Sequence, residues 1–546
     1  MLLDFFSKEL IGKYGMYFFG IVLLLILLFR IDSWGVSETS EARYAQISKE
    51  MLESNDFLHP QLMGIKHYHK PPVTYWITVI SFKIFGIDSY GARFPLQVAV
   101  LIQVFLIYGI AMILFKDRFF AFYAAVLYFS LPAVIISTRA LTTDAFLTTF
   151  ILASIYSWMK AIDNNSSNRK VFYLLFYVFL GLGFATKGPV VIIFPLIVIV
   201  ALRMQGKRMG MGYYMQILGL IVFLAIGFSW FIYLFLEDQR FFNYFFFNHT
   251  IERFATDTFQ RSEPFWFYLL VIPATSFPWA FFLFRYLFHL RKLDYDKVLL
   301  FSFWILVPVI FFSISQSKLI LYVLPVYSGI ALGSIWVWRH INDTKKNLWG
   351  KISFIYHIVS LVVLALYILF SKEIKVPNVF FLISIISVVS LVFLRFNMQC
   401  LTSRTFLSAL IFTSTLILNS TYIFSKNPHV VNDQTGILSY IKTEYPDTEN
   451  LLVFNRRLPS VQFHSDLNIV SLYYGNHDLN RETQFEKNDR WKENLLNLIE
   501  NPELIEVFNS PSNILISRKK AVLPGNFMVG WEKDTIIDKW SIYKYK

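Results

Sequence analysis

Ionisable residues are concentrated in one polar stretch, residues 36–76, of an otherwise apolar chain. The stretch carries the carboxylates Glu38 and Glu41 and the basic residues Arg43 and Lys70. Charged groups at a membrane surface are costly to desolvate, so their presence indicates a site. A carboxylate there can accept a proton from an attacking hydroxyl, and cations can hold a phosphate.

Two histidines, His67 and His69, alternate in the same stretch. In an extended segment alternate side chains face one side, which is a spacing typical of metal ligands. Two histidines are also common as plain surface residues, and the pattern leaves both readings open.

Further polar residues recur where later apolar runs begin or end. They are Arg139 and Asp144 (STRALTTDAF), Lys187 (ATKGP), His249 and Arg253 (HTIERFATDTFQRSEPFW), and Lys318 and Tyr322 (SQSKLILY). Singly, Asp144 could be a helix-dipole partner, and Lys187 and Lys318 could reach toward the membrane surface. Gathered above an apolar bundle, these residues would suit a ligand with an anionic head and a lipid tail.

The elements that must position these residues are membrane spans. The chain has 546 residues, is 55% hydrophobic and has a mean hydropathy of +0.50. Thirteen apolar runs are long enough to cross a bilayer. They lie at 14–31, 94–115, 119–138, 142–162, 171–186, 189–202, 213–236, 266–288, 297–315, 319–338, 352–371, 378–394 and 405–424. The shorter run 74–87 contains Lys83 and is predicted to be an amphipathic surface helix.

Charge fixes the predicted orientation. The net charge of +13 comes mostly from Lys and Arg in short gaps between apolar runs, on the side that also holds the N-terminus. This is the positive-inside pattern, and it argues against nucleic-acid binding. The single cysteine, Cys400, excludes an intramolecular disulfide framework and a cysteine metal cluster.

The sequence therefore predicts an all-α polytopic membrane protein of about 13 transmembrane helices with a small C-terminal extracytoplasmic α/β domain. The expected domains are 1–425, with its first extracytoplasmic loop at 31–93, and 426–546. Strand-like stretches at 450–454, 469–473 and 513–517 and a charged helical pattern at 485–499 support the second domain.

Two motifs, SEARYAQISKEM and GIKHYHKPPVTYW, resemble the first extracytoplasmic loop of polyprenyl-phosphate-sugar glycosyltransferases with the GT-C fold. These enzymes belong to the protein O-mannosyltransferase-like superfamily, and the chain most resembles its lipid A aminoarabinose transferases (ArnT-like). The likeness continues in the same order through TTDAF, ATKGP, HTIERFATDTFQRSEPFWFY, SFPW and SKLILYVL. It covers roughly residues 10–340, and beyond about 345 only the architecture matches.

The resemblance implies catalytic carboxylates. The family carries an Asp-Glu pair before x-Arg-Tyr-Ala, and here that pair reads Ser40-Glu41, so the usual Asp is absent. Either Glu41 takes the role, which we favour, or Glu38 does, one turn away in a helix. Asp144 matches the second acidic residue of the family.

The resemblance also implies a site for the donor phosphate. Lys70 matches the family's phosphate lysine, and Arg253, Lys187 and Tyr322 match other positions around the phosphate or cavity. Arg43 and Lys318 complete the predicted phosphate-binding set as basic residues of the same loops.

A divalent metal ion (Zn²⁺, Mg²⁺ or Mn²⁺) is expected from the same resemblance, with no organic cofactor. The residue before the phosphate lysine is often acidic and near a metal in the aminoarabinose enzymes, and here it is His69. The family's later histidine is displaced by one position, to His249.

The expected activity is inverting transfer of an aminoarabinose-like pentose or a hexose from undecaprenyl phosphate to lipid A or another cell-envelope acceptor. The expected place is the periplasmic side of a bacterial inner membrane. The alternatives are the same donor with a protein or polysaccharide acceptor, and a transporter or flippase for a lipid-linked sugar. Transporters place their working charges in broken spans near the midplane, whereas these charges lie in loops and at helix ends.

Overall fold

The computed structural model describes residues 14–38, 40–163, 167–207, 210, 212–252, 262–371, 373–475, 479–500 and 507–546. The chain divides into two compact units. Unit 1 comprises residues 1–31, 69–74 and 93–423, and unit 2 comprises 32–68, 75–92 and 424–546.

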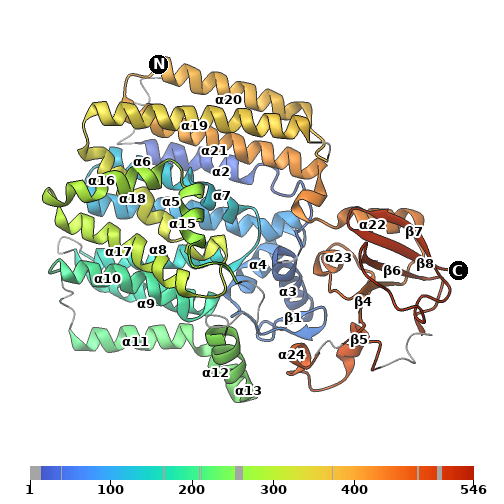
Figure 1. Cartoon of the computed structure of the whole chain (residues 1–546). Coiled ribbons are helices and arrows are strands. Elements are labelled where there is room, and N and C mark those ends of the chain that lie inside the picture. The colour runs from blue at the N-terminus through green and yellow to red at the C-terminus, as the bar shows by residue number, and fades with distance from the viewer. Residues whose placement is uncertain are drawn as a thin grey trace. The chain divides into compact units, whose positions relative to one another are not determined.

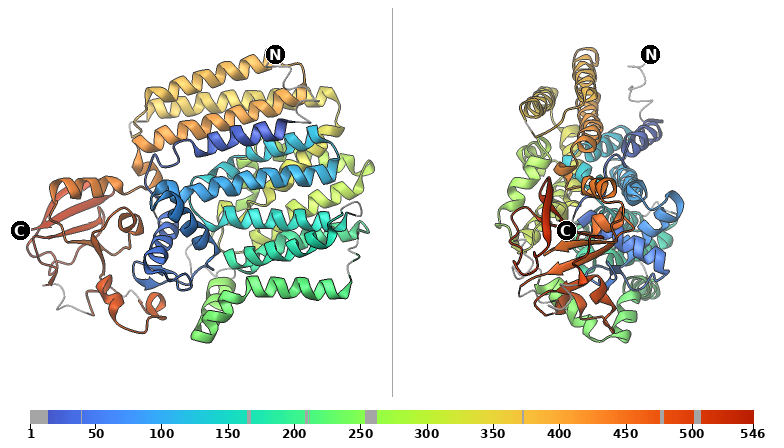
Figure 2. Two further views of the ribbon diagram at one scale, coloured as in Figure 1. Left: turned by 180° about the vertical axis from the view of Figure 1, so that it is seen from behind. Right: turned by 90° about the vertical axis from the view of Figure 1, so that its right-hand side faces the viewer.

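Unit 1 is built of helices that run side by side (Figures 1 and 2). In chain order they are α2 (Met16–Leu28), α5 (Ser89–Phe115), α6 (Arg118–Phe129), α7 (Pro132–Thr138), α8 (Thr143–Ile162), α9 (Arg169–Lys187), η3 (Pro189–Ile192), α10 (Ile193–Met204), α11 (Tyr213–Gly227), α12 (Ser229–Glu237), α13 (Arg240–Phe242), the π-helix η4 (Asn243–Glu252), α15 (Phe267–Thr275), α16 (Trp279–Leu287), η5 (Phe288–Lys292), α17 (Tyr295–Ile314), η6 (Ile320–Val323), α18 (Val326–His340), α19 (Asp343–Phe370), α20 (Asn378–Asn397) and α21 (Leu401–Lys426).

These helices make the chain a multi-pass membrane protein. Within the described residues, seven helices are long and apolar enough to cross a bilayer, and up to ten if each of three bent pairs is one span. Every apolar run predicted from the sequence contains helix, although several are short or bent. The number of 13 crossings stays a prediction.

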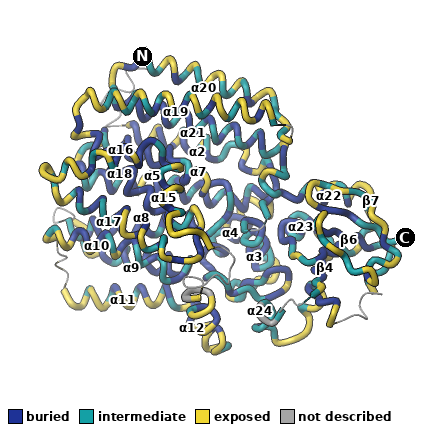
Figure 3. The backbone as a smooth tube through the Cα atoms, in the orientation of Figure 1, coloured by how far each residue is buried: buried dark blue, intermediate teal, exposed yellow. Residues whose placement is uncertain are grey.

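Helices α19 and α20 show how this apolar surface is distributed. Only 22% and 17% of their most apolar windows are buried within the protein. Figure 3 shows α20 as largely exposed. Apolar side chains over so much open surface match the hydrocarbon core of a bilayer.

Unit 2 contains a six-stranded sheet of order β5-β4-β3-β6-β8-β7. Strands β5, β4, β3 and β6 are parallel, and β8 and β7 continue the sheet antiparallel. The strands are β3 (Asn450–Phe454), β4 (Asn468–Tyr473), β5 (Leu495–Asn497), β6 (Asn513–Arg518), β7 (Trp531–Ile537) and β8 (Trp540–Tyr545). The other elements of this unit are α3 (Ser40–Ser54), β1 (Gln61–Leu62), β2 (Ile65–Lys66), α4 (Val73–Phe85), η7 (Pro428–Val431), α22 (Thr435–Glu444), α23 (Pro459–Phe463), α24 (Asn480–Thr483) and η8 (Arg490–Glu493).

Alternation along β3 builds two cores. Leu451 and Val453 face a core that also contains Ile47 and Met51 of α3. Leu452 and Phe454 face the opposite core. Successive residues of a strand point to opposite faces, so a fully apolar strand covered on both faces is the expected result. The first polar loop thus contributes a helix to the core of the C-terminal sheet.

Hydrogen bonds fix the same loop to the C-terminal segment. The Gly35 N–H donates to Asp433 Oδ2 at 2.8 Å, and the Val36 N–H donates to His464 Nε2 at 3.0 Å. The sequence-based division grouped loop 31–93 with residues 1–425. In the structure residues 32–68 and 75–92 instead pack in one unit with 424–546.

The C-terminal α/β domain is confirmed, with one local error. The predicted strands at 450–454, 469–473 and 513–517 correspond to β3, β4 and β6. The predicted helix at 485–499 is wrong, because this stretch contains only the short η8 and the edge strand β5. Leu495 and Leu496 are buried by pairing with β4, so the sheet edge prevails over the helical spacing of the charges.

Candidate active site

A buried ion pair joins two helix ends in unit 1. Lys187 Nζ lies 2.5 Å from Asp144 Oδ1, and the two side chains are 12% and 9% exposed. Asp144 is in the first turn of α8, where Thr142 caps the helix by accepting the Asp144 N–H at 3.4 Å. Negative charge is stabilised at a helix N-terminus and positive charge at a C-terminus, and Lys187 is the last residue of α9.

Tyr322 completes this cluster from a third element. The Lys187 ammonium lies 4.3 Å from the centre of the Tyr322 ring, which belongs to η6. The structure therefore brings together Asp144, Lys187 and Tyr322, which are far apart in the sequence. A cation over an aromatic face, with one carboxylate as counter-ion, is a pre-positioned charge that can meet an anionic substrate.

Lys318 lies just before η6 and is buried. Its ammonium donates to the backbone carbonyl of Glu263 at 2.6 Å. Burial lowers the pKa of Lys318. The contact gives Lys318 a structural role in holding two loops together, and its predicted contact with phosphate stays a prediction.

Arg139 lies in the turn between α7 and α8, five residues before Asp144. Its side chain is 9% exposed. None of its three side-chain nitrogens has a hydrogen-bond partner within the described part of the chain. Burial and the nearby positive charge of Arg93 lower the pKa of Arg139 to about 10, so it remains a cation at neutral pH.

The predicted metal ligands lie along one helix and one loop segment. The His69 ring is 5.9 Å from the ring of Tyr244, which belongs to η4. Position 249 follows about one turn later on the same π-helix, but the side chain of His249 lies outside the described residues. Within the residues that the structure describes, no three His, Cys, Asp or Glu side chains form a metal cluster.

In unit 2, Glu41 is almost fully buried at the start of α3, at 2% exposure. The Ser37 N–H donates to its Oε2 at 2.7 Å. The carboxylate is therefore held in one orientation by the loop that precedes the helix.

Glu38, the alternative carboxylate, has a structural contact. Its Oε2 accepts the Ser460 N–H at 3.0 Å, at the first turn of α23, and its own N–H donates to the carbonyl of Asn432. Burial raises the pKa of Glu38. These contacts anchor Glu38 through Oε2, while its Oε1 is buried and has no hydrogen-bond partner among the described residues. The choice of Glu41 over Glu38 stays a prediction.

The structure gives fewer contacts for the remaining predicted phosphate-binding residues. Arg43 follows on α3, within electrostatic range of Glu38. Lys70 is half-buried in a segment that groups with unit 1. Arg253 lies outside the described residues.

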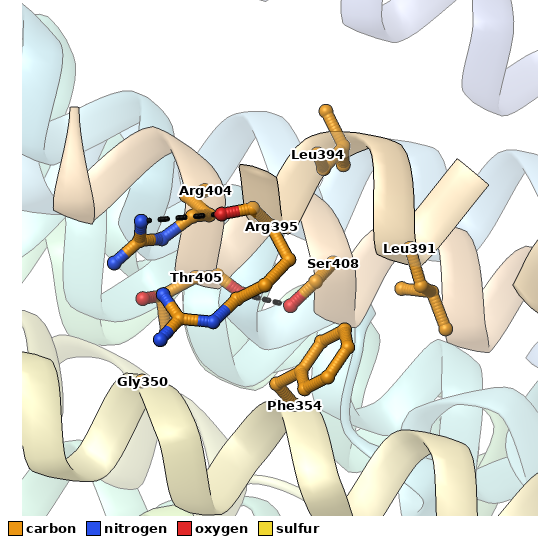
Figure 4. A pocket seen from close by; sticks show the side chains of 8 residues that line it. All are labelled: Gly350, Phe354, Leu391, Leu394, Arg395, Arg404, Thr405 and Ser408. Atoms are coloured by element: carbon orange, nitrogen blue, oxygen red, sulfur yellow. Dashed lines mark hydrogen bonds between the residues drawn. The ribbon is translucent and has the colours of Figure 1, made fainter. Parts of the chain in front are cut away.

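A cavity between α19, α20 and α21 is a separate feature (Figure 4). Its lining residues are Gly350, Phe354, Leu391, Leu394, Arg395, Arg404, Thr405 and Ser408. It contains no carboxylate, and the hydroxyls of Thr405 and Ser408 donate to carbonyls of their own helix. It offers no group for acid–base chemistry.

Comparison with known proteins supports the resemblance seen in the motifs. Residues 15–245 match the family described as dolichyl-phosphate-mannose-protein mannosyltransferase. An undecaprenyl phosphate-alpha-4-amino-4-deoxy-L-arabinose arabinosyl transferase from Photorhabdus laumondii is 29% identical over 324 residues, which cover 59% of this chain and 58% of that relative. A protein of the same description from Aeromonas hydrophila is 30% identical over 313 residues, 57% of each chain. The matches thus span somewhat more than half the length of these relatives.

The fold has a solved counterpart. The crystal structure of ArnT from Cupriavidus metallidurans bound to undecaprenyl phosphate superposes with a TM-score of 0.78 at 18% identity. The match covers 97% of this chain and 98% of that one. The predicted GT-C, ArnT-like fold is therefore confirmed.

Proposed function

We propose that this chain, a relative of the lipid-phosphate-sugar glycosyltransferases with the ArnT fold, transfers a sugar from undecaprenyl phosphate to lipid A or another cell-envelope acceptor. The reaction would take place on the extracytoplasmic face of a bacterial inner membrane, with inversion at the sugar carbon. The relatives are named for transfer of 4-amino-4-deoxy-L-arabinose from undecaprenyl phosphate, and the solved counterpart binds undecaprenyl phosphate.

The observation that carries the proposal is the buried Asp144–Lys187 pair against Tyr322. An ion pair removed from water costs free energy that its mutual attraction barely offsets, so such a pair is poor evidence for a purely stabilising role. Here it lies at the ends of two helices, where a lipid head group can approach while the tail remains between apolar helices.

In this proposal the basic residues stabilise the leaving group, which is the lipid phosphate. As the bond between the sugar and the phosphate breaks, negative charge grows on the phosphate oxygens. Lys70, Arg253 and Lys187 would stabilise that charge, because preorganised cations in a water-poor site lower the barrier most where charge develops. Release of the lipid phosphate then restores the Lys187–Asp144 pair.

Orientation of the acceptor falls to the carboxylates Glu41 and Asp144. A sugar or serine hydroxyl needs a base to take its proton as it attacks. A phosphate acceptor on lipid A is already ionised at neutral pH, so there the carboxylates would position the sugar or the acceptor rather than remove a proton.

A divalent metal ion remains part of the proposal. The described geometry fits to the extent that His69 packs against the helix that carries position 249. His69 and His249 would be the protein ligands, with the remaining positions left to water or substrate. Such an ion would add positive charge beside the donor phosphate, and no step above requires it.

A second candidate function has a specific observation in its favour. The family matched over residues 15–245 is described as acting on proteins with a lipid-phosphate mannose donor. The same donor chemistry with a protein or polysaccharide acceptor is therefore the alternative. A flippase role is disfavoured by the sequence pattern, because the ionisable residues lie in loops and at helix ends such as those of Asp144 and Lys187.

The test is mass spectrometry of lipid A from source cells with and without the gene. We expect the deletion to remove one pentose-type or hexose-type increment and the wild-type gene to restore it. Unchanged lipid A, with the protein present in membranes, would reject this acceptor, and the same comparison would then be made on secreted proteins and surface polysaccharides.

The role of Glu41 is tested in the same cells. We expect Glu41→Gln to fail to restore the increment although it reaches wild-type levels in the membrane. Full restoration would remove Glu41 from the mechanism.

A further inference from the structure

Arg139 is a buried cation, and no carboxylate among the residues that the structure describes forms an ion pair with it. Its guanidinium is 9% exposed, and its three nitrogens make no hydrogen bond within the described part of the chain. A buried charge without a partner costs several kcal/mol, and buried charges in folded proteins are normally paired. Burial of the Arg139 guanidinium therefore costs free energy, and no hydrogen bond among the described residues offsets that cost.

The turn that carries Arg139 is fixed on both sides. Leu141 and Thr138 are fully buried. Gln97 Nε2 of α5 donates to the carbonyl of Thr138, the preceding residue, at 2.7 Å. The position of Arg139 is thus set by a neighbouring helix, which is what a preorganised binding residue requires.

A second guanidinium lies close to this turn. Arg93 precedes Gln97 by four residues on α5, so both lie on one helix face, and Arg93 is fully buried. Arg93 Nη1 donates to the carbonyl of Ile31 at 2.7 Å. The two like charges repel each other, and the charge of Arg93 lowers the pKa of Arg139. An anion bound at Arg139 would offset that repulsion.

We propose that Arg139 binds the phosphate oxygens of a substrate lipid, as an anion subsite additional to the predicted donor-phosphate residues. This inference rests on the proposed function for the identity of the lipid. The planar fork of an arginine matches two phosphate oxygens, and five N–H donors are available. The phosphate belongs either to the undecaprenyl donor or to the lipid acceptor.

Location favours a part in the reaction. Arg139 is the C-cap residue of α7, and Asp144 lies five residues later in the first turn of α8. The subsite is therefore next to the Asp144–Lys187–Tyr322 cluster along the chain. That cluster is internally neutral, because one carboxylate faces one ammonium. Arg139 supplies the net positive charge that a phosphate needs.

The experiment uses the full-length protein in lipid nanodiscs and two probes, undecaprenyl phosphate and bisphosphorylated lipid A, with dephosphorylated lipid A as a third sample. Affinities and apparent melting temperatures are measured for the wild type, Arg139→Met and Arg139→Lys. The matched control is Arg457→Met, which removes another buried arginine, one that is bonded to Glu482 and to the Leu62 carbonyl.

We expect Arg139→Met to weaken binding of one phosphorylated lipid about 10- to 100-fold, the range for losing a hydrogen-bonded contact to a charged group. The lipid affected identifies the source of the phosphate. The ligand-free variant should melt no lower than the wild type, since an unpaired buried charge has been removed. Arg139→Lys should lose part of the affinity, because a single ammonium replaces the fork. Arg457→Met should melt lower and bind both lipids normally.

Wild-type affinity of Arg139→Met for both phosphorylated lipids would overturn the inference while leaving the proposed function intact. If Arg139→Met does not fold, wild-type affinity of Arg139→Lys has the same meaning. A wild type that binds lipid A through Arg139 but ignores undecaprenyl phosphate would reject the proposed donor and keep the subsite. A wild type that binds neither lipid would reject both proposals.

Discussion

Buried arginines have opposite surroundings in the two units. In unit 2, Arg457 donates to Glu482 at 3.0 Å and to the backbone carbonyl of Leu62. It thereby fastens the first loop to the C-terminal segment. In unit 1, Arg139 is as deeply buried and makes no hydrogen bond within the described residues. Two of the three side-chain nitrogens of Arg457 are bonded and only its Nε is not, whereas all three of Arg139 lack a partner among the described residues. The first arginine serves the fold, and the second points to a ligand.

Carboxylates repeat the contrast. Glu50 of α3 accepts the N–H groups of Met63 and Gly64 at 2.6 and 3.0 Å, so it orders a turn. Asp144 instead contacts a side chain, the Lys187 ammonium, at 2.5 Å. In the proposed function a substrate phosphate would compete with Asp144 for that ammonium. Glu50 and Arg457 of unit 2 thus act in its architecture, whereas Asp144 and Lys187 of unit 1 are the charges to which the proposed function assigns a role.

The largest expected effect comes from Asp144→Asn. We expect sugar transfer to fall at least about 100-fold, the lower range for loss of a positioned catalytic carboxylate. The apparent melting temperature should also fall, since Lys187 is left as an unpaired buried charge. Transfer is measured with a lipid-phosphate sugar donor and purified lipid A.

The double variant Asp144→Asn with Lys187→Met separates the two effects. Removing both charges should restore the melting temperature but not the transfer. Recovery of transfer would place Asp144 among the structural residues and break the contrast.

Arg457→Met tests the structural side. We expect a loss of about 2 kcal/mol of stability, because hydrogen bonds to charged groups contribute about 1.5–3 kcal/mol and Glu482 is partly exposed. Transfer per folded molecule should stay at the wild-type level. Denaturation monitored in nanodiscs checks the first point, and a transfer rate normalised to folded protein checks the second.

Tyr322 allows a finer test in unit 1. Replacement by Leu removes the aromatic face under the Lys187 ammonium, worth about 1 kcal/mol, and should reduce kcat/KM roughly fivefold. Replacement by Phe keeps that face and should retain most of the activity. Equal losses in both variants would assign the role to the hydroxyl group instead.

The smallest effect concerns the pH dependence of stability. Burial raises the pKa of Glu38 above its ordinary value of 4.5, so the folded protein keeps this proton to higher pH than the unfolded chain does. Stability contributed by Glu38 is therefore present below pH 4.5 and is lost as pH rises through the folded pKa.

Glu38→Gln should remove that slope. The difference in apparent melting temperature between variant and wild type should grow in favour of the variant as pH rises above 4.5. Because Glu50 titrates in both proteins, the difference isolates Glu38. Parallel curves across this window would show that Glu38 is not buried in solution.

The sequence predicts elements more fully than it predicts their partners. Asn450–Phe454 is a strand with the predicted limits, because a short apolar run covered on both faces has few alternatives. The helix predicted at residues 485–499 is wrong, because the pairing of β5 with the edge of the sheet outweighs the helical spacing of the charges in that stretch. Hydrophobic periodicity can be seen in a short stretch of sequence, but the strand with which that stretch pairs cannot.

The candidate site shows the same division. The residue types and their gathering at helix ends were predictable, and the structure joins Asp144, Lys187 and Tyr322. The sequence could not predict that Arg139 has no hydrogen-bond partner among the described residues. Whether a buried N–H group finds an acceptor depends on all the residues that pack around it. The anchoring of Glu38 by Ser460 was hidden for the same reason.

The composition of unit 2 has a consequence for the order of synthesis. Its helix α3 and loop 32–68 leave the ribosome early, but the sheet on which they pack belongs to residues 424–546. Translation at about 5–20 residues per second needs on the order of half a minute to make the intervening residues 93–423. During that interval Ile47 and Met51 have no sheet to cover them. The protein therefore completes this unit only after most of its helices have been made.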